Sequence, residues 1–227
     1  MTVVLLLSPV LGLGVAWGCW LAADYLVRFA STEPLPHPST QAPRQWLPAL
    51  VRLVTRAPFS VVQLAAEIVG IAFFVLLGLI GDIELGSLWM TIGFIFFLLT
   101  AIIDFKYRLV LNIMVYPAVV LVTATRLLAG AEIMPLLLGG GLAFGVFYLT
   151  ARLSELGSGD IKLALLLGVF FGFPQILWAL LMATGVGALI AVSLWIWHRN
   201  AKLTMPYAPF LCFGAMLAML YNPIPTL

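Results

Sequence analysis

Two aspartates stand where apolar runs of the sequence meet polar residues. Asp104 ends one apolar run in "TAIIDFKYRLVLN", and Asp160 begins another in "GSGDIKLAL". An ionised carboxylate is costly in hydrocarbon, so an acidic residue beside or within an apolar helix usually marks function. Two carboxyls held close together cannot both ionise easily; the pair shares a proton, one acting as general base and the other as general acid. Such a dyad activates water for attack on a peptide carbonyl.

Two glycines lie just before the second aspartate, on either side of Ser158. Glycine allows an unusual backbone turn and the close approach of a second chain. Gly157 and Gly159 would therefore let an extended substrate lie beside Asp160. An ordinary helix start explains the same residues, with Ser158 or Asp160 as the cap and the glycines as a turn. The motif alone leaves both interpretations open.

Glu67 stands in the middle of another apolar run, "VVQLAAEIVG". We expect it to face the interior of the protein and to accept hydrogen bonds there, which is a structural role. The sequence has no GxSxG serine, no HExxH pair and no glycine-rich phosphate loop. Serine hydrolase, metalloprotease and ATP-driven chemistry are therefore not expected.

The composition is that of an integral membrane protein. The chain has 227 residues, of which 63% are hydrophobic and 9% charged, with a mean hydropathy of +1.15; no ordinary soluble domain has such values. The net charge of +2 and the scattered basic residues give no ground to expect nucleic-acid binding. Cys19 and Cys212 lie alone in apolar segments, so neither a disulfide nor a metal site is expected.

Apolar runs predict an all-α polytopic bundle of about eight transmembrane helices. The first run is expected to be a retained helix rather than a cleaved signal. Residues 1–227 then form a single membrane-embedded domain in contact with lipids, with a proline-rich cytoplasmic loop at 27–58. Pro174 either splits one long run or bends it. The expected helices cover about 3–26, 59–80, 87–103, 109–129, 134–153, 160–173, 175–197 and 206–221.

The basic residues predict the orientation, because short loops rich in Lys and Arg stay on the cytoplasmic side. On the eight-helix scheme ten of the eleven fall on one side and Arg126 alone falls on the other. This distribution predicts an N-out, C-out protein of the inner, or cytoplasmic, membrane. It also places Asp104 and Asp160 at the same depth on the cytoplasmic face.

The long loop contains a segment, "RQWLPALVRLVTR", in which arginines alternate with apolar residues. The pattern is typical of a basic segment that lies on the inner membrane surface. A proline-rich surface linker with positive-inside arginines explains it equally well. The residues concerned are Arg44, Trp46, Leu47, Leu50, Arg52, Leu53, Val54 and Arg56.

Three blocks of the sequence resemble the type IV prepilin peptidases, which are GxGD-type aspartic proteases of the inner membrane. In "DFKYRLVLNIMVYP" an Asp is followed eight residues later by Asn, "GSGDIKLAL" is similar to the family's GxGDxKL signature, and "MPYAPFLCFG" is similar to its "PFGPFLA" block. Position 111 is Leu where the family commonly has Pro. The matching residues are Asp104, Asn112, Tyr116, Pro117, Gly157, Gly159, Asp160, Lys162, Pro206, Pro209 and Phe210.

The resemblance implies that Asp104 and Asp160 are the catalytic pair within a peptidase core at 100–221. It implies that the glycine turn shapes the active-site loop and that Lys162 lies close to the pair. The implied substrate is a prepilin or pseudopilin with a short basic leader, cut just before its hydrophobic helix and usually after a glycine. Asn112, Pro206 and Pro209 are expected to support the site, as is Glu67.

Many members of that family carry two Cys pairs that bind zinc between their first two helices. Residues 27–58 contain no cysteine, so we expect no zinc and do not expect N-methyltransferase activity. S-adenosylmethionine would be a cofactor only if methylation were retained. Two other functions stay open: a proton-coupled transporter that uses Asp104, Glu67 and Asp160 as protonation sites, and an inactive scaffold for pilus assembly.

Overall fold

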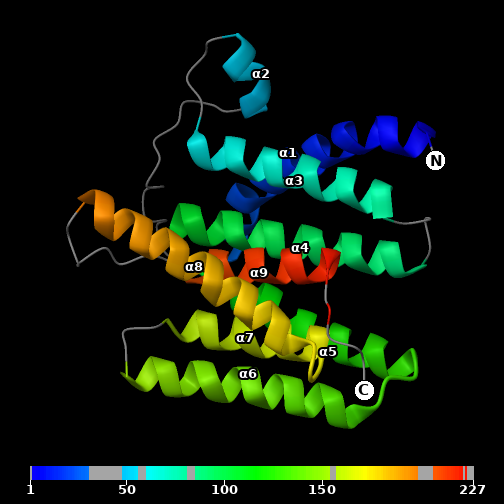
Figure 1. Cartoon of the computed structure of the whole chain (residues 1–227), viewed down its shortest axis with the longest axis vertical. Helices are drawn as coiled ribbons and strands as arrows, with labels where there is room; N and C mark the ends of the chain where they lie inside the picture. The colour runs from blue at the N-terminus through cyan, green and yellow to red at the C-terminus, as the bar shows by residue number, and fades with distance from the viewer. Residues whose placement is uncertain are drawn as a thin grey trace. The chain divides into compact units, whose positions relative to one another are not determined.

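The computed structural model describes residues 2–30, 48–55, 60–80, 85–153, 157–198, 207–221 and 223. Within these ranges the chain is α-helical (Figure 1). The helices are α1 (Thr2–Ala30), α2 (Ala49–Val54), α3 (Val61–Ile80), α4 (Leu85–Tyr107), α5 (Asn112–Leu128), α6 (Ile133–Leu153), α7 (Ser158–Phe171), α8 (Ile176–His198) and α9 (Ala208–Leu220).

Each of the eight predicted apolar runs is a helix, which confirms a polytopic helical membrane protein. Five helices, α1, α3, α4, α6 and α8, contain stretches long and apolar enough to cross a membrane, and α5 and α9 are shorter apolar helices. Helix α7 ends at Phe171 and α8 begins at Ile176, so Pro174 separates two helices rather than bending one. The N-out, C-out orientation stays a prediction.

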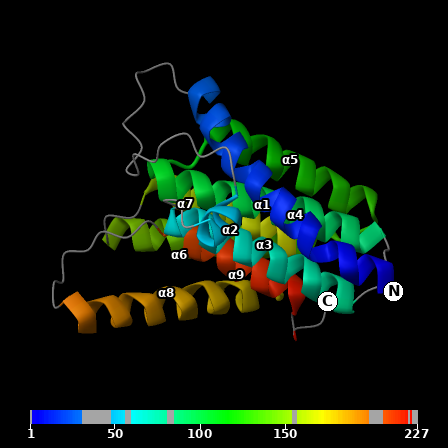
Figure 2. The ribbon, with the colours of Figure 1, turned by 90° about the horizontal axis from the view of Figure 1, so that it is seen from above.

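The chain divides into two compact units, residues 1–108 and 109–227. In unit 1, α1 packs along α3 and also contacts α4 (Figure 2). A Cβ added to Gly12 would lie 2.5 Å from the backbone oxygen of Gly70, so α1 and α3 approach backbone to backbone. Helices α3 and α4 meet through Phe73 and Phe94, whose rings stack with centroids 3.8 Å apart.

Glu67 of α3 holds the short helix α2 in unit 1. Its side chain is 0% exposed. The backbone N–H of Ala49 donates to Oε1 at 2.7 Å, and that of Leu50 donates to Oε2 at 2.9 Å. The amide of Gln63 also donates to Oε1, at 3.0 Å. Glu67 thus satisfies N–H groups that a helix start leaves without an intrahelical acceptor, as a cap does. The structural role expected from the sequence is confirmed.

Helix α2 contains residues of the predicted basic segment, whose position on the membrane surface stays a prediction. Arg52 is buried, whereas Val51 and Leu53 are exposed. Inside unit 1, therefore, α2 turns Arg52 inward and turns Val51 and Leu53 outward. The rest of the predicted basic segment, Arg44, Trp46, Leu47 and Arg56, lies outside the described residues.

Replacing Glu67 should loosen α2 from α3. In Glu67→Gln an amide NH₂ faces at least one backbone N–H in place of a carboxylate oxygen, and an unsatisfied buried donor costs about 1–3 kcal/mol. We expect faster hydrogen exchange at Ala49 and Leu50, and a lower melting temperature in detergent. Glu132→Gln, at an exposed position in unit 2, is the matched control. Unchanged exchange at Ala49 and Leu50 would contradict the capping role.

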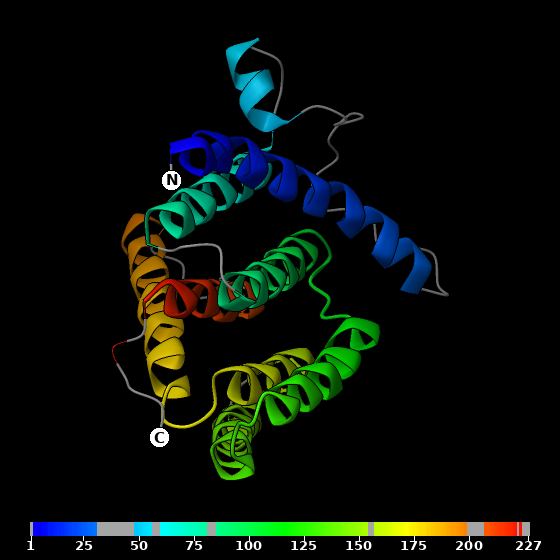
Figure 3. The same cartoon turned by 90° about the vertical axis from the view of Figure 1, so that its right-hand side faces the viewer.

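Unit 2 is organised around α7, which contacts α5, α6, α8 and α9. Helices α6 and α7 lie side by side (Figures 1 and 3). They touch at Gly139 and Gly168, where an added Cβ would overlap the backbone of the facing helix. Helix α8 meets α9 in a similar way, since a Cβ on Gly214 would lie 2.5 Å from the backbone nitrogen of Ala183. Close backbone contact through small residues is typical of helix packing in membranes.

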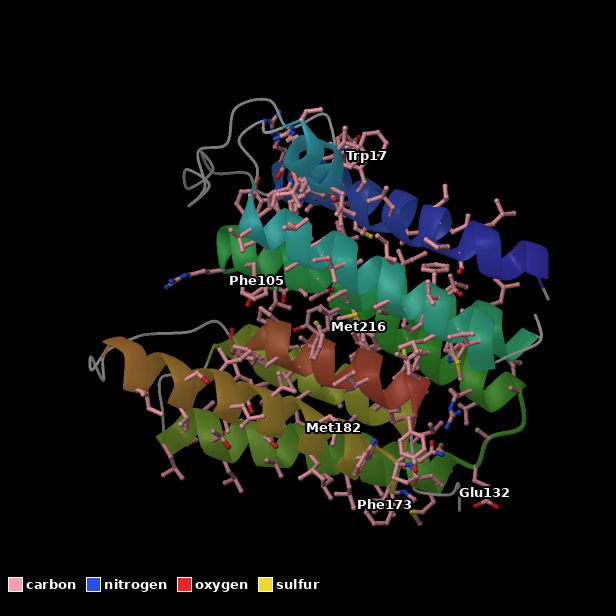
Figure 4. The ribbon with its side chains drawn as sticks, turned by 45° about the horizontal axis from the view of Figure 1, so that its top comes forward. Trp17, Phe105, Glu132, Phe173, Met182 and Met216 are labelled. Atoms are coloured by element: carbon pink, nitrogen blue, oxygen red, sulfur yellow. The ribbon has the colours of Figure 1, made fainter. Side chains whose placement is uncertain are left out.

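The two ends of unit 2 carry different groups. The starts of α5, α7 and α9 lie together, because Lys162 bonds to Asn112 and Asp160 bonds to Ala208. The opposite end holds the turns between α5 and α6 and between α7 and α8, where the N–H of Phe173 donates to the carbonyl of Pro135 at 2.8 Å. Figure 4 shows Glu132 and Phe173 at that second end. Consecutive helices of unit 2 therefore run in opposite directions, as the predicted series of membrane helices requires.

Candidate functional site

Asp160 lies at the third position of α7, one turn after the Gly157 that caps the helix. Its side chain is buried, at 9% exposure. The glycine turn places it there: Gly157 is extended, with φ −68° and ψ 144°, and the N–H of Asp160 donates to the Gly157 carbonyl at 3.1 Å. The extended residue followed at once by helical residues turns the carboxylate back over the start of α7.

The carboxylate of Asp160 accepts hydrogen bonds from the backbone N–H groups of Gly157 and Ala208. The first bond runs from the third helical position back to the cap, as in a capping box, so the helix-start interpretation is correct. The second bond comes from the start of α9, 48 positions further along the chain. A cap alone requires no such partner. Asp160 is therefore both a cap for α7 and the point where α7 and α9 meet.

Tyr207 lies directly before α9 and belongs to the surroundings of Asp160. Burial, and the negative charge of Asp160, raise the pKa of the Tyr207 phenol above its ordinary value. The phenol is protonated at neutral pH even at its ordinary pKa, so it can donate a hydrogen bond. Its ring contacts Phe147 and Phe210, at centroid distances of 5.6 and 6.4 Å. Sequence reasoning missed Tyr207, although it stands within the "MPYAPFLCFG" block.

Lys162 is held beside the start of α5. Its Nζ donates to Oδ1 of Asn112 at 2.8 Å and lies 5.3 Å from the ring centroid of Tyr116. The structure thus brings together two predicted site residues that stand 50 positions apart. Asn112 is the first residue of α5, so this bond ties α5 to the first turns of α7. A cation at this place lies at the same end of unit 2 as Asp160.

The other predicted site residues of unit 2 have different surroundings. Gly157 and Ser158 are exposed. Pro209 is buried near the start of α9, where a missing N–H costs nothing. Pro206 lies outside the described residues.

Gly159 makes room for the protein's own chain. A Cβ added there would lie 2.7 Å from the Cβ of Val110 and 3.0 Å from its Cγ2. The sequence suggested that this glycine leaves space for a substrate, but in unit 2 Val110 fills that space.

Adding a methyl group at Gly159 should therefore destabilise unit 2. Overpacking of this kind costs about 1–3 kcal/mol, so Gly159→Ala is expected to melt at a lower temperature in detergent. Val110→Gly in the same chain removes the side chain that the new Cβ would meet and should recover part of the loss. A Gly159→Ala protein as stable as the wild type would contradict the contact.

Asp104 lies in the last turn of α4, in unit 1, and is 5% exposed. Its backbone carbonyl accepts from the N–H of Arg108 at 2.8 Å. Arg108 has φ 53°, the left-handed conformation that ends many helices. Helix α4 thus stops one turn beyond Asp104. Two neighbours of Asp104 on this turn, Lys106 and Tyr107, bond to Asp24 of α1. Sequence reasoning did not single out Asp24.

The two aspartates belong to different units of the chain. Each unit offers a buried carboxyl in the first or last turn of a helix, and that of Asp160 accepts from the backbone N–H groups of Gly157 and Ala208. Within the described parts of the chain, no three His, Cys, Asp or Glu side chains are grouped so that they could hold a metal ion. That no cofactor is needed stays a prediction.

Residues 91–192 match the model of the type IV leader peptidase family. This range includes Asp104 and Asp160. The chain is also similar to a prepilin leader peptidase/N-methyltransferase of Bacillus subtilis (strain 168), with 29% identity over 163 residues. The match covers 70% of this chain and 65% of the relative, so it spans less than two thirds of the relative's length. No solved structure matches the chain.

Proposed function

We propose that this chain, whose residues 91–192 match the model of the type IV leader peptidase family, is an aspartic endopeptidase. It removes the short basic leader of type IV prepilins or related pseudopilins at the inner face of the cell membrane. The observation that carries the proposal is Asp160. Its carboxyl is buried at the junction of α7 and α9 although it follows an exposed glycine turn.

Burial of Asp160 needs a reason beyond helix capping. A capping carboxylate works equally well at an exposed helix start, and burial of a charge costs free energy. Here the carboxyl instead lies among two backbone donors and Tyr207. Buried titratable groups with specific partners gather at functional sites. This arrangement supports a catalytic role for Asp160 within the matched residues.

The proposed chemistry uses Asp104 and Asp160 as a pair that shares one proton. The ionised carboxylate takes a proton from water, and the resulting hydroxide attacks the carbonyl carbon of the scissile peptide bond. The protonated carboxyl donates its proton to the carbonyl oxygen, which gives a tetrahedral intermediate. When that intermediate collapses, the C–N bond breaks, the amine leaves with a proton from the first carboxyl, and one hydroxyl of the intermediate returns its proton to the second carboxylate. This sequence needs neither a metal nor a covalent intermediate.

The location of the proposed site suits this substrate class. A prepilin carries its leader directly before an apolar helix, so the scissile bond lies where that helix leaves the bilayer. Asp104 lies in the last turn of α4, a helix long enough to cross the membrane, and Asp160 lies near the start of α7. Both therefore stand at helix ends, as cleavage at a membrane surface requires.

Methylation is not expected of this chain. The Bacillus subtilis relative is named as an N-methyltransferase as well as a peptidase, but that name describes the relative. Residues 27–58 of this chain contain no cysteine that could hold zinc as in many members of the family. We propose that the chain acts without zinc and without S-adenosylmethionine.

A single mass measurement tests both parts of this proposal. The purified protein is incubated in liposomes with a prepilin, with and without S-adenosylmethionine, and the product is weighed by mass spectrometry. We expect a product shortened by its leader, with no added methyl group in either sample. An intact prepilin, in the presence of correctly inserted protein, would overturn the peptidase and favour the pilus-assembly scaffold.

A further inference from the structure

We propose that Asp24 of α1 is a positioning residue for Asp104, and that it acts by holding the last turn of α4 through Lys106 and Tyr107. The inference rests on the proposed function, since it assigns Asp24 a part in the same reaction. All the contacts on which it is based lie within unit 1. Asp24 does not belong to any of the three sequence blocks that carry the family resemblance.

One oxygen of Asp24 gathers two donors from the end of α4. Lys106 Nζ lies 2.6 Å from Oδ1 of Asp24, and the hydroxyl of Tyr107 donates to the same atom at 2.7 Å. The contacts join residues 82 and 83 positions apart. Two short bonds to one charged acceptor fix both the position and the rotation of the helix end, because hydrogen bonds to ionised groups are short and strong.

Trp20 adds a third contact from α1. It stands four residues before Asp24, so both side chains lie on one face of the helix. Lys106 Nζ lies 3.8 Å from the centroid of the Trp20 ring, within the range of a cation–π interaction. Trp20 itself is buried. Lys106 is thus held between a carboxylate and an aromatic ring of the same helix.

Burial makes this contact costly to lose. The side chain of Lys106 is 6% exposed, whereas that of Asp24 is 42% exposed. A buried ammonium is tolerated when a charge of opposite sign accompanies it, and removing that partner destabilises the buried charge. If Asp24 is removed, Lys106 is expected to move toward water and to take the last turn of α4 with it.

Asp104 lies in that same turn. Its carbonyl accepts the last hydrogen bond of the helix, from Arg108, and Arg108 leaves the helix in the left-handed conformation. Helix ends fray unless side chains or tertiary contacts hold them. Asp24 supplies such contacts at the two residues that follow Phe105. Figure 4 shows Phe105 on α4, where it is exposed.

Catalysis is sensitive to displacements of this size. A shift of about 1 Å at a reacting group can cost on the order of 10²-fold in rate. In the proposed reaction Asp24 contacts neither the attacking water nor the substrate. Its removal should therefore slow the chemical step without weakening substrate binding. A residue that only stabilised the fold would lower the amount of active protein instead.

The first experiment measures leader cleavage by purified protein, normalised to correctly folded material. We expect Asp24→Ala to lower kcat about ten- to hundredfold while KM stays within about twofold. Asp24→Asn keeps an oxygen acceptor for Lys106 and Tyr107, so its loss should be smaller. In a chain that carries Lys106→Met and Tyr107→Phe, adding Asp24→Ala should change kcat by less than about twofold. Glu132→Ala is the control.

The second experiment reports the position of α4 without any need for cleavage. A thiol is introduced by Phe105→Cys in a chain with Cys19→Ala and Cys212→Ala, and its labelling by a water-soluble reagent is timed. Asp24→Ala should change the labelling rate at least about threefold, because the last turn is no longer held. The Lys106→Met, Tyr107→Phe background should abolish that dependence on Asp24.

These measurements separate the inference from the proposed function. A wild-type protein that cleaves no prepilin overturns the peptidase, and the labelling rates then decide the role of Asp24 alone. Wild-type cleavage with an unchanged kcat in Asp24→Ala overturns the positioning role and leaves the peptidase intact. A labelling rate that is indifferent to Asp24→Ala likewise overturns the positioning role.

Discussion

Asp104→Asn and Asp160→Asn should each lower the rate of leader cleavage by on the order of 10³-fold or more. An amide neither takes a proton from water nor donates one as a carboxyl does, so half of the proposed pair is lost in each variant. The effect should appear in single-turnover cleavage, where binding and product release do not limit the rate. The double variant should be hardly slower than either single one, because residues that act as a unit are not additive.

Stability measurements must accompany this test. Asp160→Asn keeps one oxygen that can accept from Gly157 or Ala208, but its NH₂ faces the other donor. We therefore expect a modest decrease in melting temperature and an intact fold. Retained cleavage in either single variant would contradict the assignment of the pair, whereas loss of cleavage together with the fold would show only that the carboxyl caps α7. Glu132→Gln provides the baseline.

Gly168→Ala should give the largest loss of stability among the glycine substitutions. An added Cβ would overlap the carbonyl of Gly139, and backbone atoms cannot move aside as the end of a flexible side chain can. Helices α6 and α7 must then separate, at a cost of about 1–3 kcal/mol or more. The melting temperature in detergent, followed by circular dichroism, measures the effect.

Gly141 of α6 is the matched control for that variant. A Cβ added at Gly141 meets nothing within 4 Å, and Ala is a better helix former than Gly by about 1 kcal/mol. Gly141→Ala should therefore leave unit 2 as stable as before or more stable. Equal melting temperatures for the two variants would contradict the backbone contact between α6 and α7.

The glycine turn before Asp160 is a local motif that fits two different structural roles. From "GSGDIKLAL" a helix cap and an active-site loop were both acceptable. The structure shows that Asp160 does cap α7, and that a second bond to Ala208 and burial go beyond what a cap needs. The role expected of Gly159 changed, because Val110 occupies the space that this glycine leaves.

The sequence by itself determined the helices, their order and the membrane class. These properties depend on length and apolar composition along a single stretch of chain, so every predicted run became a helix. It also singled out Asp104, Asp160, Lys162 and Asn112, because their spacing matches family blocks. The interior position of Glu67 followed from a carboxylate within an apolar run, which must find donors in the protein.

Only the tertiary structure decided which residues accompany them. Asp24 bonds to residues 82 and 83 positions away, and Tyr207 approaches Asp160 from the start of another helix. The inward turn of Arg52 in α2 likewise depends on its packing against α3. No periodicity or local motif predicts such contacts, because they form when helices that are distant in sequence pack together. Packing therefore selected the partners of Asp160 and of the helix end that carries Asp104, whereas local sequence selected the two aspartates themselves.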